Sequence, residues 1–260
     1  MSTLRCVAVH ALESGRSDGP VVVLSGSLGS THRMWDPQMA ALEEHFRVIR
    51  YDTRGHGLSP APTGPYSIDD LADDLIGLLD RLDIDRAHLV GLSLGGMTAM
   101  RVAVRDPERV DRLAVLCTAA VLGPEQGWHD RAATVRADGV AAIAEAVVGR
   151  WFTPEFLATH PHEKTYYETM VASSSTEGYA ACCEAIAPMD QRADLASISA
   201  PTLAIAGADD PSTGPDALRA IADSVQDGRL VVVPDAAHLA SAQHPEIVNP
   251  ALVQHLTASR

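Results

Sequence analysis

The sequence has few basic residues for its acidic content. Of its 260 residues, 20 are lysine or arginine and 34 are aspartate or glutamate, so the formal net charge is −14. An acidic surface repels nucleic-acid phosphates and anionic lipid headgroups. We therefore expect neither a nucleic acid nor a membrane surface as a partner.

Long apolar runs are missing as well. The longest, residues 113–122, is about half of the roughly 20 residues that a membrane-spanning helix needs, and Thr118 interrupts it. The N-terminal sequence MSTLRCVAVHALESG lacks the basic segment and long apolar segment of a secretory signal. These absences predict a cytoplasmic protein.

Cysteine is scarce, and its spacing is uninformative for metal binding. The four cysteines show no C-x-x-C pattern, and two of them are adjacent: Cys6, Cys117, Cys182 and Cys183. Neither a disulfide framework nor a zinc site is indicated. We expect reduced, mostly packed thiols and no metal-ligand cluster.

What is present fits one folded domain. Hydrophobic residues make up 46% of the chain and charged residues 21%, close to globular averages. Single α/β domains reach about 250 residues, and no repeat or low-complexity tract divides the chain. We therefore expect one domain rather than two.

Short apolar runs alternate along the chain with segments whose apolar residues recur at helical spacing. This pattern is typical of an α/β fold with a mostly parallel central sheet flanked by helices. Ile68, Leu71 and Leu75 predict a helix over 67–82, and Ser67 with Asp70 resembles a capping box at its start. A closing helix is expected at 246–256. The expected strands, all of a buried type, are residues 21–25, 47–52, 87–91, 112–117, 202–207 and 229–234.

Residues 123–194 have a different character. They lack strand-like runs, hold two of the three tryptophans, and are expected to form several short helices. An all-helical segment between two strands predicts an inserted cap on a core made of residues 1–122 and 195–260. The alternative is a set of extra helices on the sheet with no lid role.

The most informative motif is Gly91-x-Ser93-x-Gly95, which follows an expected strand and precedes an expected helix. This context predicts a nucleophile elbow, in which the serine lies on a strained turn with an exposed Oγ. The flanking glycines are needed because a Cβ atom there would collide with the neighbouring strand or helix. We expect Ser93 to be a catalytic nucleophile.

A serine nucleophile needs a histidine base and an acid that orients it, in the chain order Ser, acid, His for this kind of elbow. His238 lies directly after the last expected strand, whereas its rivals His244 and His255 do not. Two carboxylates, Asp209 and Asp210, follow the strand at 202–207. The residues alone do not choose between them, and Asp235 is a third, less suitable acid.

The oxyanion of an acyl-transfer reaction needs two backbone N–H donors. The residue after the nucleophile, Leu94, supplies one. The second is expected from the loop after residues 21–25, where small residues let the backbone approach a ligand, and Ser27 is our choice.

These residues resemble the α/β-hydrolase superfamily over essentially the whole chain, and within it the 3-oxoadipate enol-lactonases. The segments that carry the likeness include residues 27–29, 34–38, 51–59, 91–97, 149–154 and 189–203. The family's G-x-x-D pattern falls on Gly207 to Asp210 and favours Asp210 as the acid. The sequence departs from the family at Ser25-Gly26, where many relatives have His-Gly, and at Gln243, where Glu is common.

The resemblance implies an α/β-hydrolase fold and a cofactor-free serine hydrolase that opens 3-oxoadipate enol-lactone in the β-ketoadipate pathway of aromatic degradation. A small-molecule lactone or ester is then the expected partner. Because that substrate carries a carboxylate, we expect a cation in the pocket. Arg131, one helical turn after Trp128, is the first choice, and Arg136 and Arg192 are alternatives.

Three other functions remain open at this point. The same catalytic set serves broad carboxylesterases and cofactor-free perhydrolases of the haloperoxidase type. A lactone-sensing receptor with a hydrolase fold is the non-enzymatic alternative.

Overall fold

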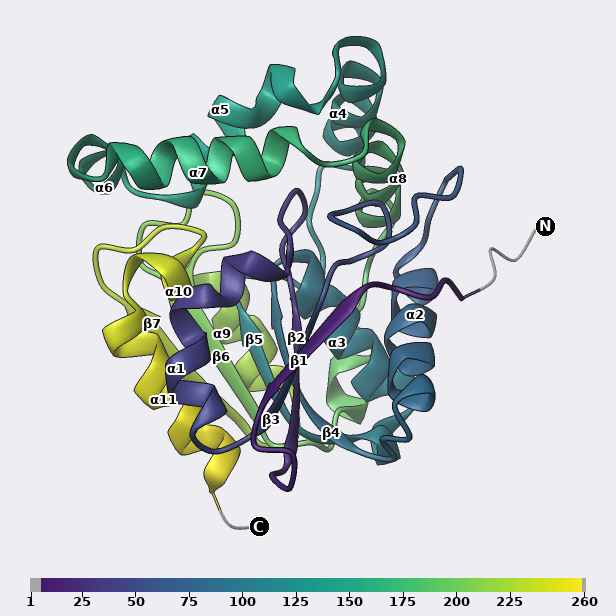
Figure 1. Cartoon of the computed structure of the whole chain (residues 1–260), viewed down its shortest axis with the longest axis vertical. Helices are drawn as coiled ribbons and strands as arrows, with labels where there is room; N and C mark the ends of the chain where they lie inside the picture. Colours follow the sequence, from purple (N-terminus) through teal and green to yellow (C-terminus); the bar gives the residue numbers. More distant parts are fainter. Residues whose placement is uncertain (1–5, 259–260) are drawn as a thin grey trace.

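A seven-stranded sheet forms the centre of the protein, as the computed structural model shows for residues 6–258 (Figure 1). The strand order is β1-β3-β2-β4-β5-β6-β7, and only the β1–β3 pair is antiparallel. The strands are β1 (Ala11–Gly15), β2 (Val21–Ser25), β3 (Arg47–Tyr51), β4 (Ala87–Leu92), β5 (Val110–Leu116), β6 (Thr202–Gly207) and β7 (Gly228–Val233). This is the expected mostly parallel α/β architecture.

All six expected strands are present, and a seventh, β1, was not anticipated. β1 reads ALESG and is largely exposed, so it lacks the apolar run that marks a buried strand. Its pairing with β3 makes it a strand. The expectation that the last strand is buried was wrong, because β7 lies at the opposite edge of the sheet and only Val233 in it is buried.

Helices cover both faces of the sheet because side chains alternate along each strand. Val22 and Leu24 of β2 join the core on one face, whereas Val23 joins the core on the other. The helices before β5 and after β6 are α1 (Asp36–Glu43), α2 (Ile68–Arg81), α3 (Leu94–Arg105), α9 (Pro215–Ser224), α10 (Ala240–Gln243) and α11 (Pro245–Thr257). The capping box of Ser67 and Asp70 is present at the start of α2.

Between β5 and β6 the chain forms only helices. They are α4 (Glu125–Asp138), α5 (Ala144–Trp151), α6 (Pro154–Thr159), α7 (Pro161–Ala172) and α8 (Thr176–Ile186), and Figure 1 shows them gathered above one end of the sheet. Short 3-10 helices occur at His32–Trp35, Pro107–Arg109, Val140–Ile143 and Leu195–Ser197. We call residues 123–194 the helical insertion. A bridge between Val121, just before the insertion, and Asp190, near its end, brings the two connections to the sheet together.

Residues 6–258 contain neither a membrane-spanning helix nor a disulfide bond. None of the helices there combines the length and the apolar character that crossing a membrane requires. The four cysteines, all within this range, form no disulfide, and only Cys6 is exposed. The expectation that the N-terminal sequence is not a secretory signal rests in part on residues 1–5, which lie outside the described part of the chain.

Candidate active site

Ser93 lies on a tight turn between β4 and α3, with a backbone φ of +55°. Two glycines make the turn possible. A Cβ atom on Gly91 would lie 2.2 Å from the carbonyl oxygen of Gly95, and one on Gly95 would lie 2.1 Å from that of Ser25. No side chain fits at such distances, so the chain can place Ser93 here only with glycine on both sides. The geometry is that of a nucleophile elbow.

Asp210 and His238 meet at the same end of the sheet, on the loops after β6 and β7. His238 Nδ1 lies 2.8 Å from Asp210 Oδ2, and both side chains are buried. The other carboxylate oxygen of Asp210 accepts hydrogen bonds from the N–H groups of Ser212 at 2.8 Å and Thr213 at 3.1 Å. His238 therefore has Nδ1 engaged, and Nε2 is the nitrogen left for Ser93.

The rival residues lie elsewhere. Asp209 is exposed, and Asp235 is exposed with its carbonyl oxygen bonded to other side chains. His244 pairs with Glu246. His255 is buried, with Nε2 3.0 Å from the carbonyl oxygen of Leu113. None of these residues lines the pocket that contains Ser93.

Opposing effects act on the Asp210 carboxyl. Burial by itself would raise its pKa, but the hydrogen bond and charge of His238, with further bonds from Ser212 and Thr213, hold the pKa below its usual value. Asp210 is thus a carboxylate at neutral pH and can stabilise a positively charged imidazole.

The two expected oxyanion donors differ in their surroundings. Leu94 is the first residue of α3, where backbone N–H groups have no partner within the helix. Ser27 lines the pocket, but its N–H donates to Met34 Sδ at 3.2 Å. A thioether is a weak acceptor, so a charged oxygen would compete well for this N–H.

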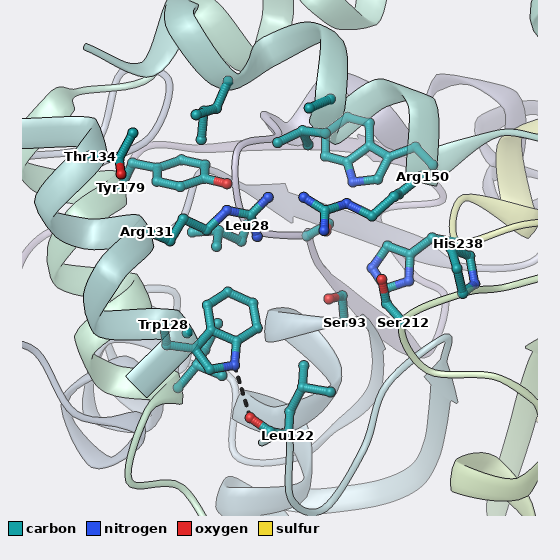
Figure 2. A pocket seen from close by; sticks show the side chains of 18 of the residues that line it. Leu28, Ser93, Leu122, Trp128, Arg131, Thr134, Arg150, Tyr179, Ser212 and His238 are labelled. Atoms are coloured by element: carbon teal, nitrogen blue, oxygen red, sulfur yellow. Dashed lines mark hydrogen bonds between the residues drawn. The ribbon is translucent and has the colours of Figure 1, made fainter. Parts of the chain in front are cut away.

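A pocket of about 510 Å³ is lined by residues from the loops at the end of the sheet and from the helical insertion. Ser27 is one of the residues that line it, and Figure 2 shows Ser93 and His238 facing it, with further lining residues from α4, α5 and α8. Among the described residues that line it there are two arginines, Arg131 and Arg150, and no carboxylate. The pocket is therefore positive although the protein carries a net charge of −14.

Arg131 packs between aromatic rings. Its guanidinium lies 5.4 Å from the centroid of Trp128 and 5.8 Å from that of Tyr179. Trp128 is fixed by a hydrogen bond from Nε1 to the carbonyl oxygen of Leu122 at 2.8 Å. The sequence spacing correctly placed Trp128 and Arg131 on one helix face.

The two alternative arginines lie outside the pocket. Arg136 pairs with Glu177 and Glu184, and Arg192 pairs with Asp190 at the surface. Neither is among the residues that line the pocket.

Arg150 is a pocket residue that the sequence reasoning missed. Figure 2 shows its guanidinium pointing from α5 toward that of Arg131. Burial lowers the pKa of Arg150, and the positive charge of Arg131 lowers it further. The available signal was the segment Gly149 to Pro154, which carries part of the family resemblance and contains this arginine.

The helical insertion is bonded directly to the loop that carries His238. The N–H of Leu239 donates to the carbonyl oxygen of Trp151 at 2.7 Å. Gln243 Nε2 donates to Thr153 Oγ1 at 2.8 Å and to the carbonyl oxygen of Asp235 at 2.6 Å. These bonds couple the position of α5 and α6 to that of the histidine.

Comparison with known proteins agrees with this geometry. Residues 19–245 match the model of the alpha/beta hydrolase fold family. A 3-oxoadipate enol-lactonase of Acinetobacter baylyi is 40% identical over 250 residues, which is 96% of this chain and 93% of the relative.

Solved structures give the same picture. The crystal structure of an enol-lactonase from Burkholderia xenovorans matches with a TM-score of 0.94 and 40% identity, over 96% of each chain. A thermophilic esterase from Thermogutta terrifontis matches with a TM-score of 0.90 and 30% identity, over 95% of this chain and 92% of the other.

Proposed function

Because the chain belongs to the α/β-hydrolase family and is a hydrolase of carboxylic esters or lactones, we propose that it opens 3-oxoadipate enol-lactone to 3-oxoadipate. The relatives named as enol-lactonases support this substrate. The proposal also assigns Ser93, His238 and Asp210 as the catalytic triad.

The observation that carries the proposal is the pair of arginines in an otherwise acidic protein. Arg131 and Arg150 line the pocket with Ser93, and no ion pair involves either of them among the described residues. Two facing cations without an acid are unfavourable unless an anion joins them. The substrate's side-chain carboxylate supplies that anion and would direct the lactone ring toward Ser93.

In the first half of the reaction, Ser93 Oγ attacks the ring carbonyl carbon and His238 Nε2 takes the serine proton. Asp210 stabilises the resulting imidazolium. The N–H groups of Ser27 and Leu94 hold the oxyanion, with Ser27 turning its N–H from Met34 Sδ to the charged oxygen. Collapse breaks the ring C–O bond, and the leaving enolate takes the proton from His238 Nε2 and becomes a ketone, which returns His238 to its neutral form.

In the second half, water attacks the acyl group on Ser93 and gives its proton to His238. The bond to Ser93 Oγ breaks, the serine regains its proton, and 3-oxoadipate is released. The product carries one carboxylate more than the substrate, and the new charge forms at Ser93, in the pocket that Arg131 and Arg150 also line.

The proposal is tested with a matched pair of substrates, the enol-lactone and its neutral side-chain methyl ester. We expect kcat/KM to be higher for the acid by roughly 10- to 100-fold, the size expected for losing hydrogen bonds to charged groups.

Equal or faster turnover of simple neutral esters would indicate a broad carboxylesterase. Turnover that requires peroxide would indicate a perhydrolase. Binding of the lactone without multiple turnovers would indicate a sensor. Each of these results would contradict the proposal.

A further inference from the structure

We propose that His10, His32 and Asp52 form a binding site for a divalent transition-metal ion, with Zn²⁺ as the test ion. One potential ligand atom from each residue lies within 4.8 Å of the other two. None of the three residues lines the pocket that contains Ser93. The site is therefore separate from the hydrolytic one and does not depend on the proposed function.

The fold brings the three residues together from distant parts of the chain. Ala11 pairs with Tyr51 in the antiparallel β1–β3 ladder, so His10 and Asp52 are the next neighbours beyond it. The N–H of Asp52 donates to the carbonyl oxygen of His10 at 3.0 Å, which extends the ladder by that step. His32, at the start of a 3-10 helix, donates its own N–H to Asp52 Oδ1 at 2.7 Å.

The carboxylate is held firmly in place. The Asp52 side chain is 0% exposed, and its Oδ2 accepts the N–H of Leu58 at 3.0 Å. Gly57 has a φ of +51°, and a Cβ there would lie 2.2 Å from Asp52 Oδ2, so only glycine lets this loop close over the carboxylate. Such a fixed oxygen is a suitable metal ligand because little conformational entropy remains to be lost.

Both imidazoles lie near that carboxylate. His32 Nδ1 lies 2.9 Å from Asp52 Oδ1, close to the separation of roughly 3 Å expected for two ligands at about 2.0–2.2 Å from one ion. The ring of His10 has no hydrogen-bond partner among residues 6–258, and its centroid lies 5.8 Å from that of His32. His10 is only partly buried, so a side-chain rotation can complete the contact.

The ligand types determine which ions fit. Two imidazole nitrogens and one carboxylate suit Zn²⁺, Ni²⁺, Co²⁺ or Cu²⁺, whereas Mg²⁺ and Ca²⁺ prefer oxygen ligands. Binding through Nδ1 requires the His32 tautomer protonated at Nε2, so any proton on Nδ1 between His32 and Asp52 passes to solvent when the ion binds. Water would fill the remaining positions. The ion would tie the segment before β1 to the end of β3.

The test is titration of metal-free, tag-free protein with Zn²⁺ by calorimetry and thermal unfolding. We expect one site and a rise in Tm of roughly 5 °C or more at a hundredfold excess over Kd, since binding to the native state alone stabilises it. His10→Ala leaves the Asp52–His32 hydrogen bond intact and should weaken binding at least about tenfold, as loss of one of three ligands implies. His162→Ala, on the exposed face of α7, is the matched control and should bind as the wild type does.

Ligation by His10 can be read directly with Co²⁺, whose visible absorption reports imidazole ligands. We expect the band in wild type and in His162→Ala and a changed band in His10→Ala. No saturable binding, or equal binding by wild type and His10→Ala, would overturn the proposal. The same loss in His162→Ala would assign the ion to surface histidines and would overturn it as well.

Discussion

At the scale of single residues, Ser93 carries the strongest mechanistic prediction. Its backbone is strained and its side chain is buried, and the fold does not need a serine there, because another small residue would fit better. Ser93→Ala should therefore retain the fold while kcat falls by several orders of magnitude, as loss of a triad nucleophile does. Circular dichroism checks the fold, and steady-state hydrolysis checks kcat. A folded variant with more than about a tenth of wild-type activity would refute the mechanism.

The acid is the next residue to test. Asp210 contacts His238, whereas Asp209, its neighbour, is exposed. Asp210→Asn should lower kcat by up to about 10⁴-fold because an amide favours the wrong histidine tautomer. Asp209→Asn is the matched control and should change kcat less than about twofold, as expected for an exposed side chain. Equal effects of the two changes on kcat would reject Asp210 as the orienting acid.

The pocket arginines should act on substrate binding. Removing one charged hydrogen-bond donor costs about 1.5 kcal/mol or more, so Arg150→Ala and Arg131→Ala should each raise KM for the carboxylated lactone by roughly tenfold. Hydrolysis of a neutral ester should hardly change. Arg192→Ala, which removes a surface partner of Asp190, is the control. A similar loss on both substrates would indicate that the arginine supports the helical insertion instead of the substrate.

At the scale of elements, Gln243 connects the helical insertion to the histidine loop. Its side-chain oxygen accepts the N–H groups of Thr153 and Ala237, both at 3.3 Å, in addition to the bonds that its amide nitrogen donates. Gln243→Ala should lower the free energy of unfolding by about 1–3 kcal/mol because buried polar groups lose their partners.

The same change should lower kcat more than it changes KM, since Ala237 precedes His238 and the loop would loosen. Urea unfolding and steady-state kinetics measure the two effects separately. Loss of stability with an unchanged kcat would show that the bond supports packing but does not position His238.

At the scale of the whole molecule, a buried histidine links α11 to the sheet and makes stability depend on pH. Burial lowers the pKa of His255 to about 4. The unfolded chain binds this proton near pH 6.5, so between about pH 6.5 and 4 it holds more protons than the native state does. Stability is therefore full above about pH 6.5 and falls as the pH drops, by on the order of 3 kcal/mol for this residue.

Urea unfolding at about pH 7.5 and about pH 5 tests this pH dependence. In His255→Gln the loss of stability between the two pH values should be smaller than in wild type, since glutamine does not titrate. Burial also lowers the pKa of His56, so a residual dependence of the same sign should remain. An identical pH dependence of stability in wild type and His255→Gln would show that His255 is not its source.

The sequence by itself determined those features whose physical cause is local. Apolar runs of strand length mark strands, so six of the seven were predictable, although β7 among them is an exposed edge strand. The elbow requires glycines on both sides of Ser93, so it leaves a fixed pattern of neighbouring residues. The capping box of Ser67 and Asp70 and the shared helix face of Trp128 and Arg131 also depend only on residues three apart.

The tertiary structure decided what depends on contacts between distant residues. From the residues alone Asp209 and Asp210 were equivalent, and the loop conformation after β6 turns only Asp210 to His238. Arg150 faces the pocket because of how α5 packs. β1 exists because β3 pairs with it, and β7 is exposed because it is an edge strand.

The His10, His32 and Asp52 cluster contrasts with the expectation that no metal-ligand cluster would be found. Its members are spaced about 20 residues apart and resemble no ligand motif in sequence. Local physics can be read along a chain, but the meeting of remote side chains depends on the register of strands and the packing of helices. Only the folded chain specifies those.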